Sequence, residues 1–160
     1  MHRRAAPLRS VLTLALVATL AAASGAAHAH AYLDASSPAA FEATTSVEIV
    51  ELRFTSDLEP AFSRFELRRL ELPDDAWPAD PAAPTDVERT RLTAFAARSI
   101  ADGDDTAVIA IEVAPTGRTP VVTLTPTAPL EAGAYAVAYE VLAVDGHTIG
   151  GHFVFFVRAD

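Results

Sequence analysis

The sequence has 160 residues and is 51% hydrophobic, which suits one domain with its own core and is short for two. Its formal charge is −9, with 12 basic against 21 acidic residues, and the basic residues are not clustered. Nucleic acid is therefore a poor candidate partner, because binding phosphates needs clustered cations. The absence of cysteine excludes disulfides and thiolate metal sites.

The first segment has the three parts of a secretory signal peptide. A basic start, "MHRRAAPLRS", is followed by an apolar run over 11–23 and by the small residues of "SGAAHA". The apolar run is too short to span a bilayer comfortably. We therefore expect residues 1–29 to be removed and residues 30–160 to form an exported domain without membrane insertion. That domain would carry nine arginines against 21 acids, a formal charge of −12.

The position of the cut decides which residue comes first in the mature chain. Cleavage after Ala29 fits the Ala-x-Ala preference and makes His30 the new amino terminus. Cleavage after Ala27 is the competing prediction, and it would leave His28 in front.

The mature chain is predicted to consist mainly of short strands. Residues 62–70, "FSRFELRRL", alternate as a half-buried strand should, although a short helix also fits. The last two strands are the clearest, since apolar residues alternate regularly along each. The predicted strands are 47–54, 62–70, 106–113, 120–126, one strand within 133–147, and 151–157. Their spacing, with Pro and Gly between them, predicts an all-β, antiparallel β-sandwich or small barrel.

The strand pattern breaks down between residues 71 and 106. Four prolines in "PDDAWPADPAAP" predict a long surface loop inserted into the domain. Residues 86–100, "DVERTRLTAFAARSI", could form a helical turn or an edge strand, and the pattern does not decide between them.

The candidate chemistry lies at the two ends of the mature chain, which has three histidines: His30, His147 and His152. In an extended segment residues i and i+2 point the same way, so Asp145 and His147 can present a carboxylate and an imidazole toward one point. An amino-terminal His30 adds its α-amine and Nδ1. Three nitrogens and one oxygen suit a tetragonal Cu(II) site, whereas Cu(I) prefers sulfur ligands.

A purely structural interpretation competes with this site. Asp-Gly is an ordinary turn dipeptide, and a histidine after it can be incidental. His152 alternates with Phe153 and Phe155 and is expected on the strand surface. Tyr135, Tyr139 and Trp77 are expected to pack in the core or a loop rather than bind metal.

The order of these features resembles the copper resistance protein CopC family. The resemblance rests on "HAYLDASSPAA" at 30–40, "VELRFTSDLEPAFSRFEL" at 50–67 and "LEAGAYAVAYEVLAVDGHTIGGHFVFFV" at 130–157. It implies a Greek-key, immunoglobulin-like β fold and one Cu(II) per chain, held by His30, Asp145 and His147. Some relatives add a glutamate where this chain has Ser56 next to Asp57. Some relatives have a methionine-rich Cu(I) site. This chain has no counterpart of that site, because Met1 is its only methionine.

The leading hypothesis is a non-enzymatic, monomeric, exported Cu(II)-binding protein. It would sequester copper, confer resistance to it, or deliver it to an inner-membrane copper transporter of the CopD type. Its expected location is the periplasm, or the exterior if the cell has one membrane. The alternatives are a histidine-brace copper oxidase or monooxygenase, and an immunoglobulin-like interaction module without metal.

Overall fold

The computed structural model describes residues 30–103 and 107–159. The predicted signal peptide, residues 1–29, lies outside the described residues. In chain order the elements are β1 (Leu33–Ser37), β2 (Ala43–Thr44), β3 (Val50–Leu58), η1 (Pro60–Phe62), β4 (Arg64–Leu70), η2 (Asp74–Ala76), α2 (Asp86–Asp102), β5 (Val108–Ile109), β6 (Ile111–Ala114), β7 (Thr119–Pro126), β8 (Gly133–Leu142) and β9 (Thr148–Val157).

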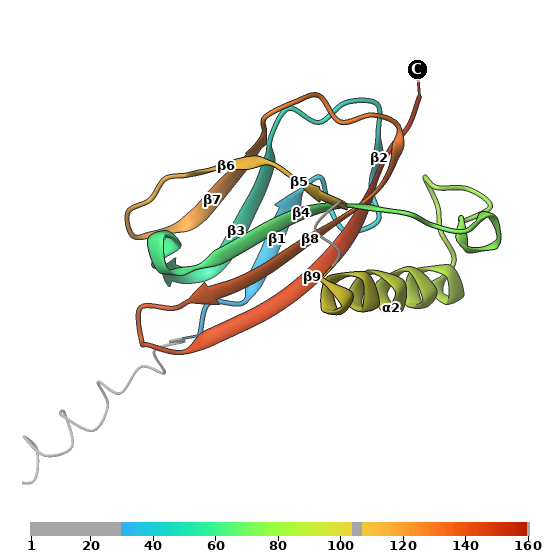
Figure 1. The fold of residues 1–160 in the computed structure, drawn as a ribbon. Helices are drawn as coiled ribbons and strands as arrows, with labels where there is room; N and C mark the ends of the chain where they lie inside the picture. Colours follow the sequence, from blue (N-terminus) through green and yellow to red (C-terminus); the bar gives the residue numbers. More distant parts are fainter. Residues whose placement is uncertain (1–29, 104–106, 160) are drawn as a thin grey trace, which may run out of the picture.

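The strands form two sheets packed face to face (Figure 1). One sheet has the order β1-β3-β7-β6, and the other has the order β2-β9-β8-β4-β5. All pairs are antiparallel except β2 with β9. The chain crosses repeatedly from one sheet to the other, as in immunoglobulin-like sandwiches. The predicted all-β sandwich is confirmed, and within the described residues the sheets do not close into a barrel.

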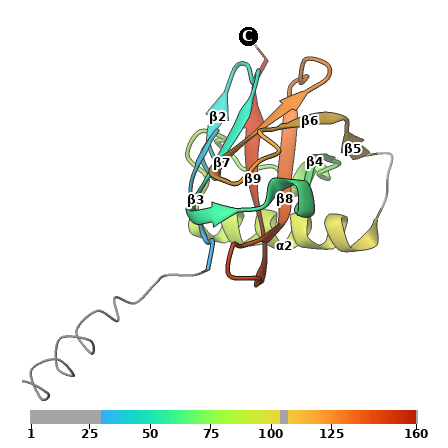
Figure 2. The same cartoon turned by 90° about the vertical axis from the view of Figure 1, so that its left-hand side faces the viewer.

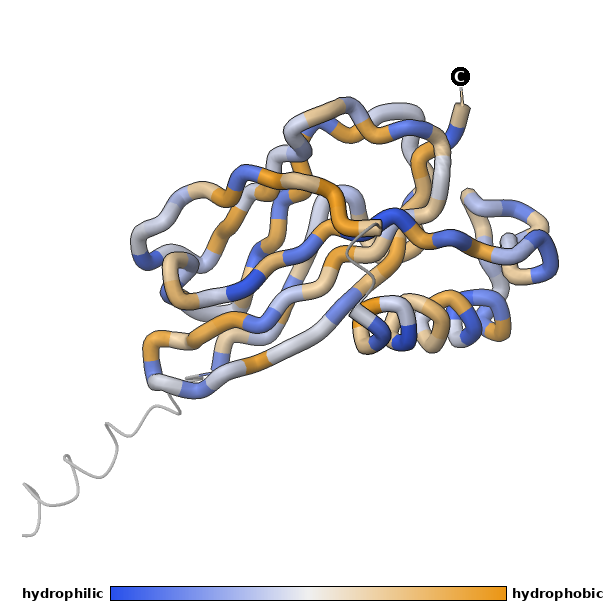
Figure 3. Tube along the Cα trace, viewed as in Figure 1, coloured by the Kyte–Doolittle hydropathy of each residue, from blue (hydrophilic) through white to orange (hydrophobic). Residues whose placement is uncertain are grey.

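The main core lies between the two sheets. The inward positions of β3, β7, β8 and β9 supply most of it, and Figure 3 shows hydrophobic and hydrophilic residues alternating along the strands. Such alternation is expected where one face of a strand is buried. The fully buried members include Val50, Leu52, Leu58, Leu67, Val122, Leu124, Val137, Val141 and Phe155.

The loop predicted at 71–106 ends where the helix α2 begins, so that prediction is wrong from Asp86 on. Residues 86–100, which the sequence left open between a helical turn and an edge strand, are helical. Thr85 caps the helix: its side chain accepts a hydrogen bond from the Glu88 N–H, and the Glu88 carboxylate accepts one from the Thr85 N–H. This is a capping box, and Gly103 ends the helix with a left-handed φ of 66°. The Thr-x-x-Glu pattern at Thr85 and Glu88 is the sequence signal for the start of this helix. The four prolines before it favoured a loop over the whole segment.

Helix α2 covers the outer face of the five-stranded sheet (Figure 2). Leu92 and Ala96 are its buried residues, one turn apart, and they pack against β4, β8 and β9. The sheet partners are Leu70, Ala134, Ala136, Val154 and Phe156. The five-stranded sheet is thus buried on both faces, which explains why β9 is apolar at successive positions from Phe153 to Val157.

Two other sequence predictions are sharpened. The strand expected at 47–54 begins at Val50 and continues to Leu58, and the ambiguous segment 62–70 is the strand β4 after the short turn η1. No helix among the described residues has the length and apolar character needed to cross a membrane.

Candidate metal centre

The turn between β8 and β9 is held firmly against the sandwich. The Ala143 N–H donates to the His147 carbonyl oxygen at 2.9 Å, which closes the turn. Ala143 itself is buried and forms a β-bridge with Leu58 at the end of β3. Gly146 has a φ of 86°, a conformation that glycine adopts without strain. The turn therefore presents its side chains from a fixed backbone.

Asp145 uses its two carboxylate oxygens differently. Oδ1 accepts a hydrogen bond from the His147 N–H at 3.0 Å, which is the Asx-turn contact typical of Asp in turns. Oδ2 is buried, and among the described residues no hydrogen bond reaches it. His147 Nδ1 lies 3.0 Å from Oδ2 without hydrogen-bond alignment. One oxygen thus stabilises the turn, and the other remains as a free acceptor.

His30 reaches the same carboxylate from the other end of the chain. Its Nδ1 lies 3.6 Å from Asp145 Oδ2, and its ring centroid is 4.8 Å from that of His147. One ligand atom from each of the three side chains lies within 4.8 Å of the other two. The start of β1 and the β8–β9 turn lie at the same end of the sandwich (Figures 1 and 2). The structure therefore brings together the three residues that the sequence singled out.

Hydrogen bonding and charge keep the Asp145 carboxylate ionised. Its pKa is lowered from the ordinary carboxyl value, mainly because the His147 N–H donates to it, and the imidazoles of His147 and His30 act in the same direction. The side chain of Asp145 is 16% exposed, whereas those of His30 and His147 are 46% and 65% exposed. A carboxylate thus lies beneath two imidazoles that face solvent, and an ion could approach all three side chains directly.

These donors fit a divalent transition metal. Two imidazole nitrogens and one carboxylate oxygen suit Cu(II), and the buried, unpartnered Oδ2 is an acceptor that a cation would satisfy. A free α-amine on His30 would add a third nitrogen. No cysteine is present, and Met1 is the only methionine, so the chain offers almost no sulfur ligand of the kind that Cu(I) prefers.

Two residues near the centre do not join it. Asp57 lies on the exposed side of β3, and its carbonyl oxygen accepts a hydrogen bond from the Val144 N–H at 3.3 Å. The Ser56 hydroxyl is buried and has no hydrogen-bond partner among the described residues. The Asp57 carboxylate does not belong to the group of three ligand atoms.

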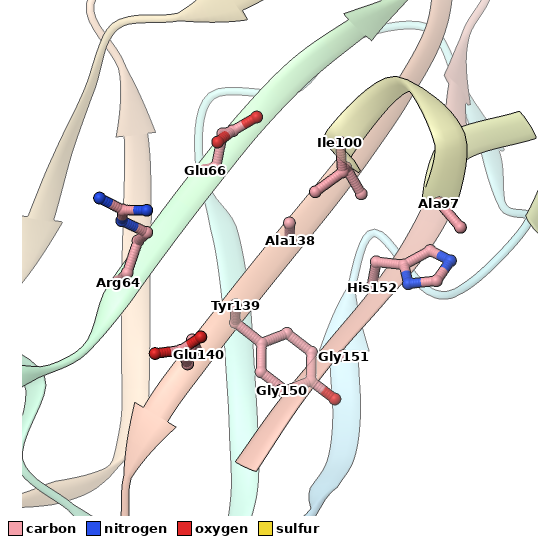
Figure 4. A pocket seen from close by; sticks show the side chains of 10 residues that line it. All are labelled: Arg64, Glu66, Ala97, Ile100, Ala138, Tyr139, Glu140, Gly150, Gly151 and His152. Carbon is pink, nitrogen blue, oxygen red and sulfur yellow. The ribbon is translucent and has the colours of Figure 1, made fainter. Parts of the chain in front are cut away.

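His152 lies elsewhere, beside a groove of about 440 Å³ between α2 and the outer face of β8 and β9 (Figure 4). Its Nε2 is 3.2 Å from the Thr93 carbonyl oxygen in α2, so the imidazole links the helix to β9. The side chain is half-buried beneath the helix rather than free on a strand surface. The groove contains none of the three candidate ligands.

Sequence analysis did not single out Thr55, which contacts the backbone of His30. The Thr55 hydroxyl donates to the His30 carbonyl oxygen at 3.1 Å. A threonine in a strand is ordinary, and no local pattern distinguishes this one.

One family model matches the C-terminal part of the chain. The family model of the CopC domain matches residues 90–158. The resemblance to the CopC family is confirmed. CopC-family proteins are copper-binding resistance proteins and not enzymes. The match includes Asp145 and His147 and begins after His30.

Solved structures show the same fold. The chain is similar to PcoC, a methionine-rich copper resistance protein from Escherichia coli, with a TM-score of 0.55 and 24% identity over 81% of this chain and 100% of that chain. It is also similar to CopC from Methylosinus trichosporium OB3b, with a TM-score of 0.53 and 21% identity over 81% of this chain and 95% of that chain. No curated protein matches the chain.

Proposed function

We propose that this protein is an exported Cu(II)-binding protein that holds one copper ion per chain at His30, Asp145 and His147. The family supports copper binding in general. The observation that carries the specific site is the convergence of the three side chains, with ligand atoms within 4.8 Å of one another, from segments more than 110 residues apart.

The proposed donor set favours the divalent ion. His30 would contribute its α-amine and Nδ1, Asp145 would contribute Oδ2, and His147 would contribute an imidazole nitrogen. Nitrogen and oxygen ligands bind Cu(II) more tightly than the other divalent ions of the first transition row. The negative charge of Asp145 offsets part of the charge of the ion.

Export and site formation are linked in this proposal. The α-amine of His30 becomes free only when the peptide bond after Ala29 is cut, so the precursor lacks one ligand. Periplasmic location follows from the predicted signal peptide and agrees with the family, whose members are periplasmic copper-resistance proteins. The mature protein, a monomer, would sequester copper or pass it to a membrane copper transporter of the CopD type.

The ligands also explain why binding rather than oxidation is proposed. A histidine brace uses two histidines and the amine and leaves positions open for oxygen. Here the Asp145 carboxylate lies between the two imidazoles, 3.0 Å and 3.6 Å from their Nδ1 atoms, and would take one of those positions. Exposed imidazoles further suit a site from which an ion is exchanged.

The test is a Cu(II) titration of protein that begins at His30, with His30→Ala and His147→Ala as variants. Each variant should lose more affinity than the roughly 10–100-fold typical of an outer-shell change, because a ligand itself is removed. His152→Gln is the matched control, since glutamine also donates to the Thr93 carbonyl, and it should bind like the parent. The proposal is wrong if His30→Ala and His147→Ala bind Cu(II) as tightly as the parent.

Intact mass with and without copper completes the test. The secreted protein should begin at His30 and gain the mass of one copper ion. A version with one extra residue before His30 lacks the terminal amine at that position and should bind more weakly. Secreted protein that begins at His28, or equal binding by the extended version, would contradict the role of the amine.

A further inference from the structure

Thr55 makes three hydrogen bonds to the segment that carries His30. Its backbone N–H donates to the Tyr32 carbonyl oxygen at 2.9 Å. Its hydroxyl oxygen accepts from the Tyr32 N–H at 3.1 Å and donates to the His30 carbonyl oxygen at 3.1 Å. One side chain therefore binds a backbone donor and a backbone acceptor two residues apart.

These contacts replace regular strand pairing at the start of β1. Leu33 pairs with Phe54, so Tyr32 lies opposite Thr55, and in a regular antiparallel pair the Tyr32 N–H would bond the Thr55 carbonyl. The Thr55 hydroxyl takes that place and also bonds the carbonyl of His30. The side chain thereby sets the path of the chain before β1 begins.

The backbone of His30 has few other restraints. Within the part of the chain that the structure describes, the hydrogen bonds of residues 30–32 are those of the His30 carbonyl and of the Tyr32 N–H and carbonyl. All three have Thr55 as their partner. Ala31 is fully buried and fixes the depth of the segment in the core, but burial alone does not fix rotation about the backbone bonds of His30. The His30 carbonyl is the group whose direction Thr55 determines.

We propose that Thr55 is a positioning residue for the amino-terminal copper ligand. The hydrogen bond from Thr55 fixes the peptide plane that contains the carbonyl and the Cα of His30. It therefore fixes the point from which the α-amine and the imidazole reach toward Asp145 and His147. Thr55 does not touch the ion; it reduces the freedom that His30 loses on binding, as outer-shell partners of metal ligands do. This inference rests on the proposed function.

The experiment compares three substitutions in protein that begins at His30. Thr55→Val keeps the shape and the strand preference of threonine and removes the hydroxyl, whereas Thr55→Ser keeps the hydroxyl. Thr123→Val is the matched control, because the Thr123 hydroxyl also donates to a backbone carbonyl, that of Ala114, in the middle of the same sheet. Cu(II) affinity and the Cu(II) electron paramagnetic resonance spectrum are measured for each.

Thr55→Val should lower the Cu(II) affinity about tenfold, the lower end of the range for outer-shell partners of metal ligands, and should give a mixed spectrum as His30 samples several orientations. Thr55→Ser should stay within about threefold of the parent and keep a single spectrum. Thr123→Val should match the parent in both measurements. If Thr55→Val does not fold, Thr55→Ala removes the same hydroxyl and is read in the same way.

The outcomes separate the two proposals. If His30→Ala and His147→Ala bind as tightly as the parent, the proposed function fails. If those variants lose affinity while Thr55→Val keeps the parent's affinity and spectrum, the role of Thr55 is wrong and the copper site stands. Equal losses for Thr55→Ser and Thr55→Val would also overturn it, because the hydroxyl would then not be responsible.

Discussion

Gly151→Ala is expected to destabilise the fold because an aromatic ring occupies the space of the new methyl group. Gly151 in β9 pairs with Tyr139 in β8, and the Tyr139 ring lies across it (Figure 4). A Cβ at position 151 would lie 2.6 Å from the Tyr139 Cζ and 3.2 Å from its Cε1. The ring also packs edge-on against Phe54, at 5.5 Å and 84°, which limits its movement.

The magnitude follows from two opposing effects. Overpacking a tightly packed site costs about 1–3 kcal/mol, and position 151 is half-buried. Replacing glycine with alanine also restricts the unfolded chain, which returns about 0.4–1 kcal/mol. The net loss should therefore be about 1–2 kcal/mol, or a fall in Tm of roughly 3–8 °C for a domain of this size. Urea unfolding followed by circular dichroism measures it.

Gly150→Ala is the matched control at the neighbouring position. A Cβ at 150 would meet only the Tyr139 carbonyl oxygen, at 3.5 Å, which is an ordinary contact. The same substitution should therefore be neutral or stabilise the protein by up to about 1 kcal/mol. The substitution is thus expected to destabilise the protein at position 151 and not at position 150.

A double-mutant cycle tests the cause. In a Tyr139→Leu background the ring is absent, and Gly151→Ala should lose most of its cost. The reasoning is refuted if Gly151→Ala is as harmless as Gly150→Ala, or if its cost persists when the ring is removed.

Further predictions concern the turn and the helix. Asp145→Asn keeps an oxygen that accepts from the His147 N–H but loses the charge, so Cu(II) affinity should fall while the metal-free fold is retained; Asp145→Ala should lower both the affinity and the unfolding free energy in urea. Because the folded state lowers the pKa of Asp145, its stabilisation is present above the ordinary carboxyl pKa of about 4 and is lost as pH falls through the lower folded value. The difference in unfolding free energy between the parent and Asp145→Asn should thus stay constant above about pH 5 and shrink as pH falls below about 4, and a difference that stays constant in acid would contradict the assignment. Thr85→Ala should cost about 1 kcal/mol by removing the cap of α2 and should leave Cu(II) affinity unchanged.

The chemistry of the candidate site could be predicted from local sequence. Asp145, Gly146 and His147 form a turn by their own preferences: aspartate bonds the backbone two residues on, and glycine accepts a positive φ. The same local bond aligns the carboxylate and the histidine. The interpretation of Asp-Gly as a turn is confirmed. Its interpretation as part of a metal site stays a prediction, and the two are compatible because Oδ1 of Asp145 stabilises the turn while Oδ2 faces the two imidazoles.

The helix α2 shows where local pattern was insufficient. Only Leu92 and Ala96 are buried along its 17 residues, so the apolar periodicity is weak. The helix is stabilised by its capping box and by packing on the outer face of the five-stranded sheet. That face exists only once β4, β8 and β9 have paired, which no segment determines alone.

The sequence by itself determined the alternating strands, the lack of sulfur ligands and the identity of the three candidate ligands, because these depend on composition and on near neighbours in the chain. The tertiary structure decided that His30 lies beside Asp145 and His147, and that Thr55 holds the backbone of His30. Those contacts join residues 115 and 25 positions apart. Their formation depends on the packing of two sheets, since that packing brings the start of β1 and the β8–β9 turn to the same end of the sandwich.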